Sequence, residues 1–246
     1  MSTDDTCDVA IIGGGVAGQS AGIFTARHGL STTIFDTGSS LLRRNAHLEN
    51  YPGFPDGVDA RFLLESMREQ TERAGCDWVE RAVSRVEVID GQFRIELTDG
   101  NATSAQYVVA ATKNEIGYLD HLDDIELIQR GSKYFIETDR RGRTEIDGLY
   151  AAGRIALEPH QTVICAGHGA KVGLTILEDD DAPFYQDWVA PAGYFTGRGR
   201  DVPPGCEEND EDERLRREER GRSSMRDRLE TPYPDAPEQH PSVADE

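Results

Sequence analysis

The sequence is poor in lysine, in cysteine and in long apolar runs, and each shortage argues against a class of protein. Lys113, Lys133 and Lys171 are the only lysines among 26 basic residues. The four cysteines are widely spaced, with no Cys-x-x-Cys pair and no metal-ligand spacing, so we expect reduced thiols and no metal. No run approaches the roughly 20 apolar residues of a membrane span, and we expect no membrane association. Residues 1–5 have neither a basic region nor an apolar core, which favours a cytoplasmic protein.

Negative charge dominates the composition. The chain has 46 Asp and Glu against 26 Lys and Arg, which gives a formal net charge of −20. Low lysine with abundant carboxylates resembles proteins of salt-loving (halophilic) archaea, in which an acidic surface keeps the chain hydrated. We therefore interpret the acidity as an adaptation to solvent rather than a site for a basic partner. Nucleic acid is not an expected partner, because its phosphates would be repelled and no basic stripe occurs.

A glycine-rich turn near the start of the chain is its most informative motif. Residues 8–12 form a short apolar run that leads directly into a G-x-G-x-x-G over residues 13–18. A helical stretch then ends at Gly29, and a second apolar run over residues 32–35 closes with Asp36, 18 positions after Gly18. This order of strand, glycines, helix, strand and acid is typical of a dinucleotide-binding site.

Each part of the motif has a physical role in such a site. Gly13 permits the tight turn, Gly15 lets a pyrophosphate approach the backbone, and Gly18 lets helix and strand pack closely. The helix N-terminus directs free N–H groups at the phosphates. Asp36 can accept hydrogen bonds from a ribose. The alternative, a glycine-rich turn with a packing role only, does not explain the acid.

The patterns downstream predict an alternation of strands and helices. We expect a loop with two prolines over residues 49–55, an amphipathic helix over residues 60–74 stopped by Gly75, a hairpin of residues 82–89 and 92–97 around Asp90-Gly91, strands over residues 107–111, 133–137 and 149–153, and a helix from Thr162 to about Leu177.

The character of the chain changes from Glu178 onward. Residues 207–229 are dense in both charge signs and predict a solvated helix, and the proline-rich last residues predict disorder. Trp188, Tyr194 and Phe195 precede that helix. We expect these aromatic side chains either to form a flap over a bound cofactor or to dock the tail on the body or on a second subunit.

Four segments, in this order, resemble the FAD domain of thioredoxin reductases. They are residues 13–18, the Glu-Asn-Tyr-Pro-Gly-Phe-Pro loop of residues 49–55, residues 147–153, and Gln161 at the start of the last helix. The resemblance runs from about Cys7 to Leu177. It implies an α/β fold: a Rossmann-like FAD-binding domain with a parallel central sheet, a β hairpin layer and a C-terminal extension. The implied domains are 1–178, with halves 1–118 and 122–178 joined directly, and an acidic, partly disordered extension over 179–246.

The resemblance also implies which residues contact FAD. Around the pyrophosphate these are Gly13, Gly15, Val16, Ala17 and Gly18, with Asp36 on the adenosine ribose and Val83 at the adenine. Asn50 would lie beside the flavin or the ribityl chain, and Gly153 and Arg154 near the ribityl phosphate. The others are Ala111 and Thr112 at the end of the strand of residues 107–111, and His160, Gln161 and Thr162 at the start of the last helix. The positive end of that helix would face the flavin N1/O2 edge, where reduced flavin is negatively charged.

Departures from the family pattern are as informative as the matches. The family inserts an NADPH-binding domain with a Cys-x-x-Cys pair after Thr112, whereas here only a short segment leads to residues 133–137. The glycines of residues 167–173 do not match a second nucleotide motif, and we interpret them as small residues for close helix packing. Arg154 stands where the family has an aspartate, and Lys113 stands where it has a glycine. Both add positive charge near the pyrophosphate, which could help to bind FAD or could mark a different nucleotide.

Two functions from different classes are consistent with this pattern. The first is an FAD-dependent oxidoreductase that resembles thioredoxin reductase but takes electrons from an external donor: a nicotinamide cofactor, a redox protein or a small molecule. The alternative is a non-catalytic FAD- or nucleotide-binding protein that serves as a redox sensor or an assembly subunit. The resemblance also implies a homodimer.

Catalytic side chains are not evident, and three candidates remain. Cys165 and His168 lie three residues apart and would share a helix face, where an imidazole could activate a thiolate. The alternative, which we favour, is that Cys165 is a small core residue and His168 its polar neighbour. His160 precedes the last helix at the expected cofactor edge and is the better candidate.

Overall fold

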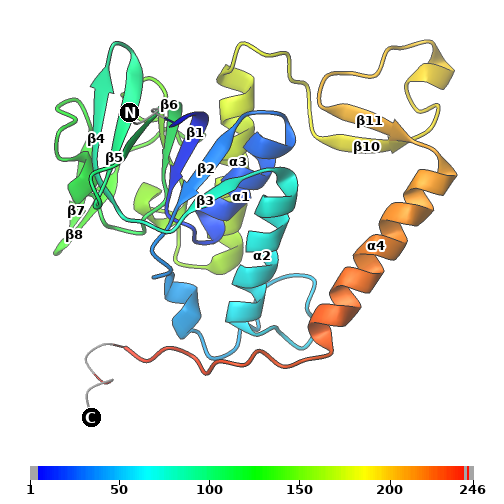
Figure 1. The fold of residues 1–246 in the computed structure, drawn as a ribbon, viewed down its shortest axis with the longest axis horizontal. Helices are drawn as coiled ribbons and strands as arrows, with labels where there is room; N and C mark the ends of the chain where they lie inside the picture. The colour runs from blue at the N-terminus through cyan, green and yellow to red at the C-terminus, as the bar shows by residue number, and fades with distance from the viewer. Residues whose placement is uncertain (1–4, 241–242, 244–246) are drawn as a thin grey trace. The chain divides into compact units, whose positions relative to one another are not determined.

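The computed structural model describes residues 5–240 and 243 (Figure 1). The chain divides into two compact units, one of Met1–Ile176 with Pro237–Glu246 and one of Leu177–Ala236. The last segment thus groups with the first unit, whereas the sequence assigned it to the extension. The predicted division into an FAD domain and an extension stays a prediction.

A mostly parallel sheet forms the centre of the first unit. Its parallel strands are β1 (Asp5–Ile12), β2 (Thr32–Phe35), β3 (Asp77–Val79), β6 (Ala102–Ala110) and β9 (Leu149–Ala151). They lie in the order β3-β2-β1-β6-β9, with Val9 opposite Tyr107 and Ala110 opposite Ala151. The predicted α/β class with a Rossmann-like parallel sheet is confirmed.

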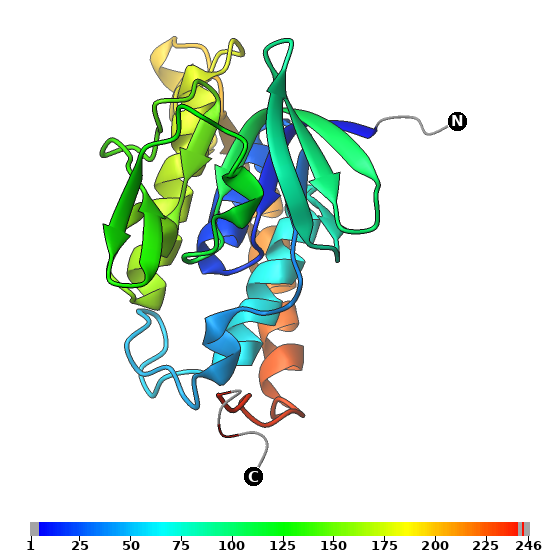
Figure 2. The same cartoon turned by 90° about the vertical axis from the view of Figure 1, so that its left-hand side faces the viewer.

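A β hairpin continues the sheet on the far side of β6. It consists of β4 (Val83–Ile89) and β5 (Gln92–Leu97), which are antiparallel, and the turn residues Asp90 and Gly91 both have positive φ, 51° and 81°. These values suit the predicted two-residue turn. Strand β6 pairs with two strands along the same edge: its first half pairs with β5 and its second half pairs with β9. The hairpin layer predicted from the sequence is therefore present (Figure 2).

Side chains of β1 alternate between two cores. Val9 and Ile11 pack in a cluster with α1 (Val16–Arg27) and α3 (Thr162–Asp179), whereas Ala10 and Ile12 pack with the hairpin strands. Both faces of the sheet are thus covered, which explains why its strands are continuous apolar runs. No helix within residues 5–240 is long and apolar enough to cross a bilayer.

Helix α2 (Ala60–Ala74) begins and ends where the sequence predicts. The Asp59 side chain accepts hydrogen bonds from the N–H groups of Arg61 and Phe62, and Gly75 ends the helix in the left-handed conformation. Its apolar face packs with Leu48 and Val58 of the preceding loop. This packing fixes the loop that leads to the expected cofactor site.

Helices α1 and α3 approach each other through glycines. A Cβ atom added at Gly169 would lie 2.0 Å from the carbonyl oxygen of Ala17, and one at Gly173 would lie 2.7 Å from that of Ala21. The interpretation of residues 167–173 as small residues for close packing is therefore confirmed at these two positions. Because Ala17 belongs to the first turn of α1, this contact also fixes the glycine-rich turn.

The connection from β6 to β9 spans residues 111–148. It contains the short 3₁₀ helix η2 (Gly117–Leu119) and a small antiparallel hairpin of β7 (Leu127–Arg130) and β8 (Lys133–Ile136). Two further 3₁₀ helices, η1 (Leu41–Arg44) and η3 (Gly153–Ala156), follow β2 and β9. All of these short elements lie near the carboxyl ends of the parallel strands.

The second unit contains a feature that the sequence reading missed. Strands β10 (Trp188–Pro191) and β11 (Cys206–Asn209) pair in parallel, η4 (Thr196–Arg198) lies between them, and α4 (Glu211–Leu229) follows. The predicted helix over residues 207–229 is therefore wrong at its start. Residues 206–209 join a strand pair instead, and Asp210 caps the helix by accepting a hydrogen bond from the N–H of Glu213.

The three tail aromatics pack on one another within the second unit. The ring centroids of Trp188 and Tyr194 are 4.5 Å apart, and those of Tyr194 and Phe195 are 5.0 Å apart. The Glu208 carboxylate accepts a hydrogen bond from the Thr196 hydroxyl and others from the N–H groups of Gly193, Phe195 and Thr196, which lowers its pKa to about 2. These rings thus form a small core; the flap and docking roles stay predictions.

The predicted disorder of the last residues is wrong for part of the tail. Arg43 and Glu238 form an ion pair with an Nε–Oε1 distance of 2.5 Å, and the backbone N–H of Glu238 donates to the carbonyl of Arg43. Glu238 is therefore held against Arg43 of η1. The prediction also covers residues 241–246, of which only Val243 is described.

Candidate functional site

A cavity of about 870 Å³ opens at the carboxyl ends of the parallel strands. Its walls come from the ends of β1, β2, β6 and β9, from η1 and the loop after it, from the start of β4 and from the first turns of α1 and α3. In open α/β sheets, ligands bind in this crevice outside the strand ends. The volume lies within the usual range for small-molecule sites.

The glycine turn forms one wall, and its three glycines have different roles. Gly13 has φ +112°, and a Cβ there would lie 2.6 Å from the carbonyl oxygen of Ala111. A Cβ at Gly18 would lie 2.0 Å from the carbonyl oxygen of Gly13, so this residue permits the helix to pack on the strand. Gly15 lines the cavity, and an added Cβ would have only Ser40 Oγ near it, at 3.7 Å. The space beside Gly15 is thus available to a ligand.

The N-terminus of α1 is not capped by a side chain. Gly15 is the N-cap residue and offers no side-chain oxygen to the N–H groups of the first turn. Val16 and Ala17, whose N–H groups belong to that turn, both line the cavity. Uncapped N–H groups at a helix start bind phosphate, so the wall can hold a pyrophosphate.

Asp36 is fixed by the backbone of two loops. Its Oδ1 accepts a hydrogen bond of 3.0 Å from the N–H of Gly14, and its Oδ2 accepts one of 3.0 Å from the N–H of Gly38. The carboxylate lines the cavity and retains lone pairs for further donors. Its position suits a ribose hydroxyl.

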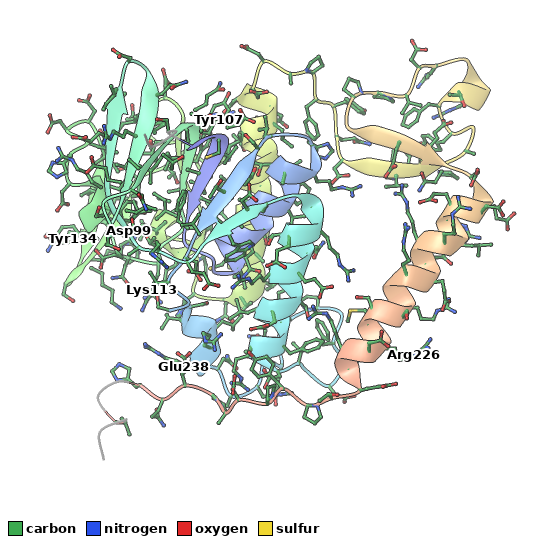
Figure 3. All side chains as sticks on the ribbon, in the orientation of Figure 1. Asp99, Tyr107, Lys113, Tyr134, Arg226 and Glu238 are labelled. Atoms are coloured by element: carbon green, nitrogen blue, oxygen red, sulfur yellow. The ribbon has the colours of Figure 1, made fainter. Side chains whose placement is uncertain are left out.

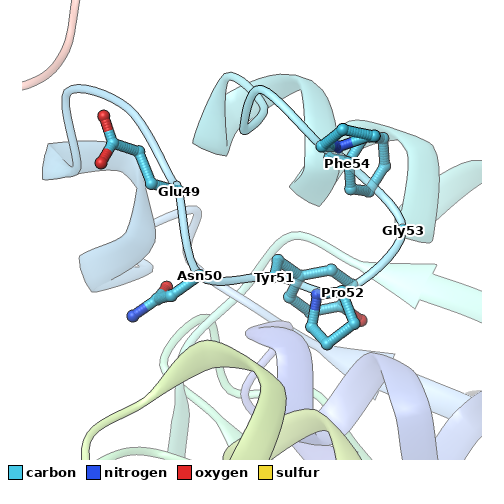
Figure 4. A pocket seen from close by; sticks show the side chains of 7 residues that line it. Glu49, Asn50, Tyr51, Pro52, Gly53 and Phe54 are labelled. Atoms are coloured by element: carbon cyan, nitrogen blue, oxygen red, sulfur yellow. The ribbon is translucent and has the colours of Figure 1, made fainter.

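Asn50 joins the proline-rich loop to the start of α3. Its Nδ2 donates a hydrogen bond of 2.9 Å to Oε1 of Gln161, and both residues line the cavity. Residues 49–55 also form a separate hollow of about 450 Å³, in which Tyr51 and Phe54 lie on different sides and Asn50 points outward (Figure 4). The loop thus holds Asn50 toward the α3 end of the main cavity.

The same end of the cavity carries several basic groups. Arg44, Lys113, Arg154 and His160 all line it. Burial, followed by the charges of Arg154 and two lysines, lowers the pKa of His160 below its usual 6.5, so the imidazole is mainly neutral at pH 7. Lys113 lies just after β6 with φ +67°, a left-handed conformation that favours glycine (Figure 3).

Cys165 has the properties of a core residue. Its side chain is buried, its Sγ donates to the carbonyl oxygen of Pro159, and burial is the largest cause that raises its pKa above 9.0. A thiol with a raised pKa is a poor nucleophile. Although Cys165 lines the cavity, these features argue against an activated thiolate.

His168 supports the turn after β9 and does not line the cavity. Its Nδ1 accepts a hydrogen bond of 3.0 Å from the backbone N–H of Gly153, and its Nε2 lies 3.8 Å from Glu158 Oε1. Burial lowers its pKa, which favours the neutral ring that this acceptor role requires. Its role is therefore to position Gly153, and of the three catalytic candidates His160 is best placed.

Cysteine reactivity tests this reading. We expect iodoacetamide at neutral pH to leave Cys7, Cys76 and Cys165 unmodified in the folded chain, because burial raises all three pKa values, to about 11 for Cys7 and about 12 for Cys76. The readout is the mass of the intact protein, with the urea-unfolded chain as the fully reactive control. Rapid alkylation of Cys165 would instead revive the nucleophile hypothesis.

The structure brings most of the predicted cofactor residues together. The residues that line the one cavity are Gly13, Gly15, Val16, Ala17, Asp36, Asn50, Val83, Ala111, Thr112, Arg154, His160, Gln161 and Thr162. Gly18 and Gly153 are not part of its lining. At Gly153, φ is +74° and a Cβ would lie 2.7 Å from Ala17 Cβ, so this glycine permits a close approach to α1.

Several lining residues were not among the predicted set. They include Ser39, Ser40, Arg44, Arg81 and Tyr118. Arg44 belongs to a loop whose sequence does not show which side chains face the cavity. Tyr118 belongs to η2, and its hydroxyl oxygen lies 3.0 Å from Oγ1 of Thr112. The unusual charges at Lys113 and Arg154 were the one signal in the sequence that further basic groups gather here.

Comparison with known proteins agrees with this geometry. Residues 8–48 match the FAD binding domain family. The chain is 30% identical over 138 residues to the thioredoxin reductase of Streptomyces coelicolor, which covers 55% of this chain and 43% of that protein. It is 32% identical over 117 residues to the NADPH-dependent thioredoxin reductase 3 of Arabidopsis thaliana, which covers 44% of this chain and 22% of that protein. The chain is thioredoxin reductase-like.

A solved structure shows the same fold at lower identity. A thioredoxin reductase from Gloeobacter violaceus aligns with a TM-score of 0.62 and 16% identity, covering 74% of this chain and 99% of that one. The chain spans less than half the length of these two curated relatives. FAD is the cofactor that the sequence matches indicate.

The cavity fits that cofactor on structural grounds. The open space at Gly15, the uncapped start of α1 and the anchored carboxylate of Asp36 provide the groups that a pyrophosphate and a ribose require. The cavity thus has a dinucleotide-binding wall, and Lys113 and Arg154 add positive charge to the same cavity.

Proposed function

We propose that the protein is a flavin-dependent oxidoreductase that receives electrons from an external donor. The observation that carries the proposal is the single cavity in which the glycine turn, Asp36, the loop of Asn50 and the start of α3 meet. Bound FAD would supply hydride or electron transfer, while the chain binds and orients it.

Different residues of the chain would bind different parts of FAD. The N–H groups at the start of α1 would hold the pyrophosphate, and Asp36 would accept a hydrogen bond from the adenosine ribose. Val83, at the beginning of β4, would lie along the adenine. The start of α3, with His160, Gln161 and Thr162, would place a positive helix end against the flavin edge that becomes negative on reduction.

The connection between β6 and β9 supports an external donor. Residues 111–148, all described, contain η2 and the hairpin of β7 and β8 but no strand–helix–strand unit that could bind a second nucleotide. A free nicotinamide cofactor, a redox protein or a small reductant would therefore deliver the electrons. A homodimer and a cytoplasmic location remain parts of this proposal.

A binding protein without turnover is the second candidate. It is favoured by one observation: Cys165 is a buried thiol and His168 is used to support Gly153, so neither shows the features of a redox or acid–base catalyst. Such a protein would hold FAD as a redox sensor or as an assembly subunit.

Visible absorption before and after anaerobic NADPH tests the proposal. We expect the purified full chain to show flavin bands that bleach on reduction by NADPH or by another donor. Bound flavin that no donor bleaches would favour the sensor or assembly function instead. A chain that cannot be loaded with FAD would contradict both functions. A sample of free FAD with the same donors is the control for reduction in solution.

A further inference from the structure

Basic side chains gather at one end of a cavity in a strongly acidic protein. Four cationic side chains line the cavity, Arg44, Arg81, Lys113 and Arg154, against two carboxylates, Asp36 and Glu115. The whole chain has a net charge of −20, and two of its three lysines, Lys113 and Lys133, lie close enough to His160 to lower its pKa. The cavity wall therefore has the opposite charge balance from the rest of the protein.

Arginines elsewhere in the described chain are commonly neutralised by carboxylates. Arg68 pairs with Glu72 and Glu80, with N–O distances of 3.1 and 3.0 Å, and Arg217 pairs with Glu207 at 2.7 Å. A cation without such a partner is expected where the fold keeps carboxylates away from it.

The fold keeps carboxylates away from the cluster of Arg44, Lys113 and Arg154. None of these side chains has an ion pair or a side-chain hydrogen bond within residues 5–240, and the Nε of Arg44 is buried with no hydrogen-bond partner. Mutual repulsion is evident at Lys113, whose pKa is lowered by burial and then by the charges of Arg154 and Arg44. A buried unpartnered donor costs free energy unless a ligand satisfies it.

The two carboxylates of the wall are already engaged. Glu115 Oε1 accepts a hydrogen bond of 3.1 Å from the N–H of Gly117, and Asp36 accepts from Gly14 and Gly38. Arg81, the fourth cation, pairs with Asp99 at 3.4 Å. Of the four cations in the wall, the three of the cluster thus have no carboxylate partner within residues 5–240.

The backbone at Lys113 adopts φ +67°, a conformation in which glycine is favoured and a β-substituted residue is strained. The following turn is tight, because Asn114 and Glu115 both donate to the carbonyl of Thr112.

We propose that Arg44, Lys113 and Arg154 form a phosphate-binding subsite that takes the phosphoryl groups of a small-molecule ligand. Arginine guanidinium groups hold phosphate oxygens in pairs, and a lysine adds a compact charge, so the set suits a phosphate or diphosphate better than a single carboxylate. This proposal depends on the proposed function only because the subsite lies in the cavity that would also bind FAD. Its ligand is either the FAD diphosphate itself or a separate phosphorylated molecule.

Calorimetric titration with inorganic pyrophosphate tests the subsite, in full-length protein at fixed ionic strength, because salt screens exposed charge. We expect the flavin-free chain to bind pyrophosphate, and Arg154→Gln, Arg44→Gln and Lys113→Gly each to weaken binding by about tenfold or more. Lys113→Gly removes the charge and the strained side chain together, so its midpoint of urea unfolding should not fall. Arg94→Gln is the matched control: Arg94 pairs with Glu96 at 3.3 Å and does not line the cavity, so the affinity of this variant should stay within about twofold of the parent.

The FAD-loaded chain then identifies the source of the phosphate. Loss of pyrophosphate binding on loading assigns the subsite to the FAD diphosphate, whereas retained binding that still depends on Arg154 assigns it to a separate phosphorylated molecule. No binding by the flavin-free chain, or equal affinities of the parent and all three cluster variants, would overturn the proposal. Because flavin reduction is not part of the readout, failure here is distinct from failure of the oxidoreductase proposal.

Discussion

Gly15→Val is expected to abolish FAD binding while the chain stays folded. Gly15 has φ −75°, a conformation open to any residue, and the space beside it contains only Ser40 Oγ at 3.7 Å. A valine side chain would therefore fit the fold but occupy the room that a pyrophosphate needs. We expect the Kd for FAD to rise by about 100-fold or more. The free energy of unfolding should fall by no more than about 1 kcal/mol, the scale of an N-cap change.

Flavin fluorescence on titration of the flavin-free chain measures the first quantity, and urea unfolding measures the second. Gly197→Val is the control: it lies in the second unit, and its Cβ would meet nothing within 4 Å. Its affinity for FAD should equal that of the parent. If Gly15→Val also binds FAD with the parental affinity, the glycine turn does not hold the pyrophosphate and the site assignment is wrong.

Gly169→Ala is expected to cost about 3 kcal/mol of folding free energy or more, the upper range for overpacking a core. The added Cβ would lie 2.0, 2.7 and 2.8 Å from the carbonyl oxygen, carbonyl carbon and Cα of Ala17. All three are backbone atoms, so no side chain can rotate away and the two helices must separate. Because Ala17 lies in the first turn of α1, the same displacement should also weaken FAD binding.

Gly167→Ala provides a control in the same helix. Gly167 is exposed, and its added Cβ would meet nothing within 4 Å. Alanine is the better helix former, so this variant should gain about 0.5–1 kcal/mol. Urea unfolding of both variants gives the comparison. Equal losses of stability in the two variants would show that helix propensity, and not the contact between α1 and α3, decides the effect.

Local sequence signals were sufficient for the first half of the nucleotide site. The strand ending at Ile12 and the glycine turn are contiguous, and Asp36 follows at the end of the next strand, 18 positions after Gly18. Local signals were also sufficient for the hairpin at Asp90-Gly91 and for the start of α2 at Asp59. The turn and cap predictions succeeded because the interactions concerned span only a few positions in the chain, whereas Asp36 was found from its spacing in the dinucleotide motif.

Long-range pairing was the main source of failure. The charge pattern of residues 206–209 is compatible with a helix, and only their pairing with β10 makes them a strand. The three-residue strand β3 is too short for its pattern to be seen, and it forms because β2 offers it an edge. Likewise, no local signal shows that Glu238 returns to Arg43.

The sequence by itself determined the fold class, the dinucleotide motif and thirteen of the residues that line the cavity. Its departures from the family pattern at Lys113 and Arg154 already indicated additional positive charge near the pyrophosphate. Only the tertiary structure decided that Arg44 joins these two residues without a carboxylate partner, that His168 supports Gly153, and that Cys165 is a buried thiol. The physical reason is that charge compensation, burial and pKa depend on which groups meet in space, and here they come from chain segments far apart in sequence.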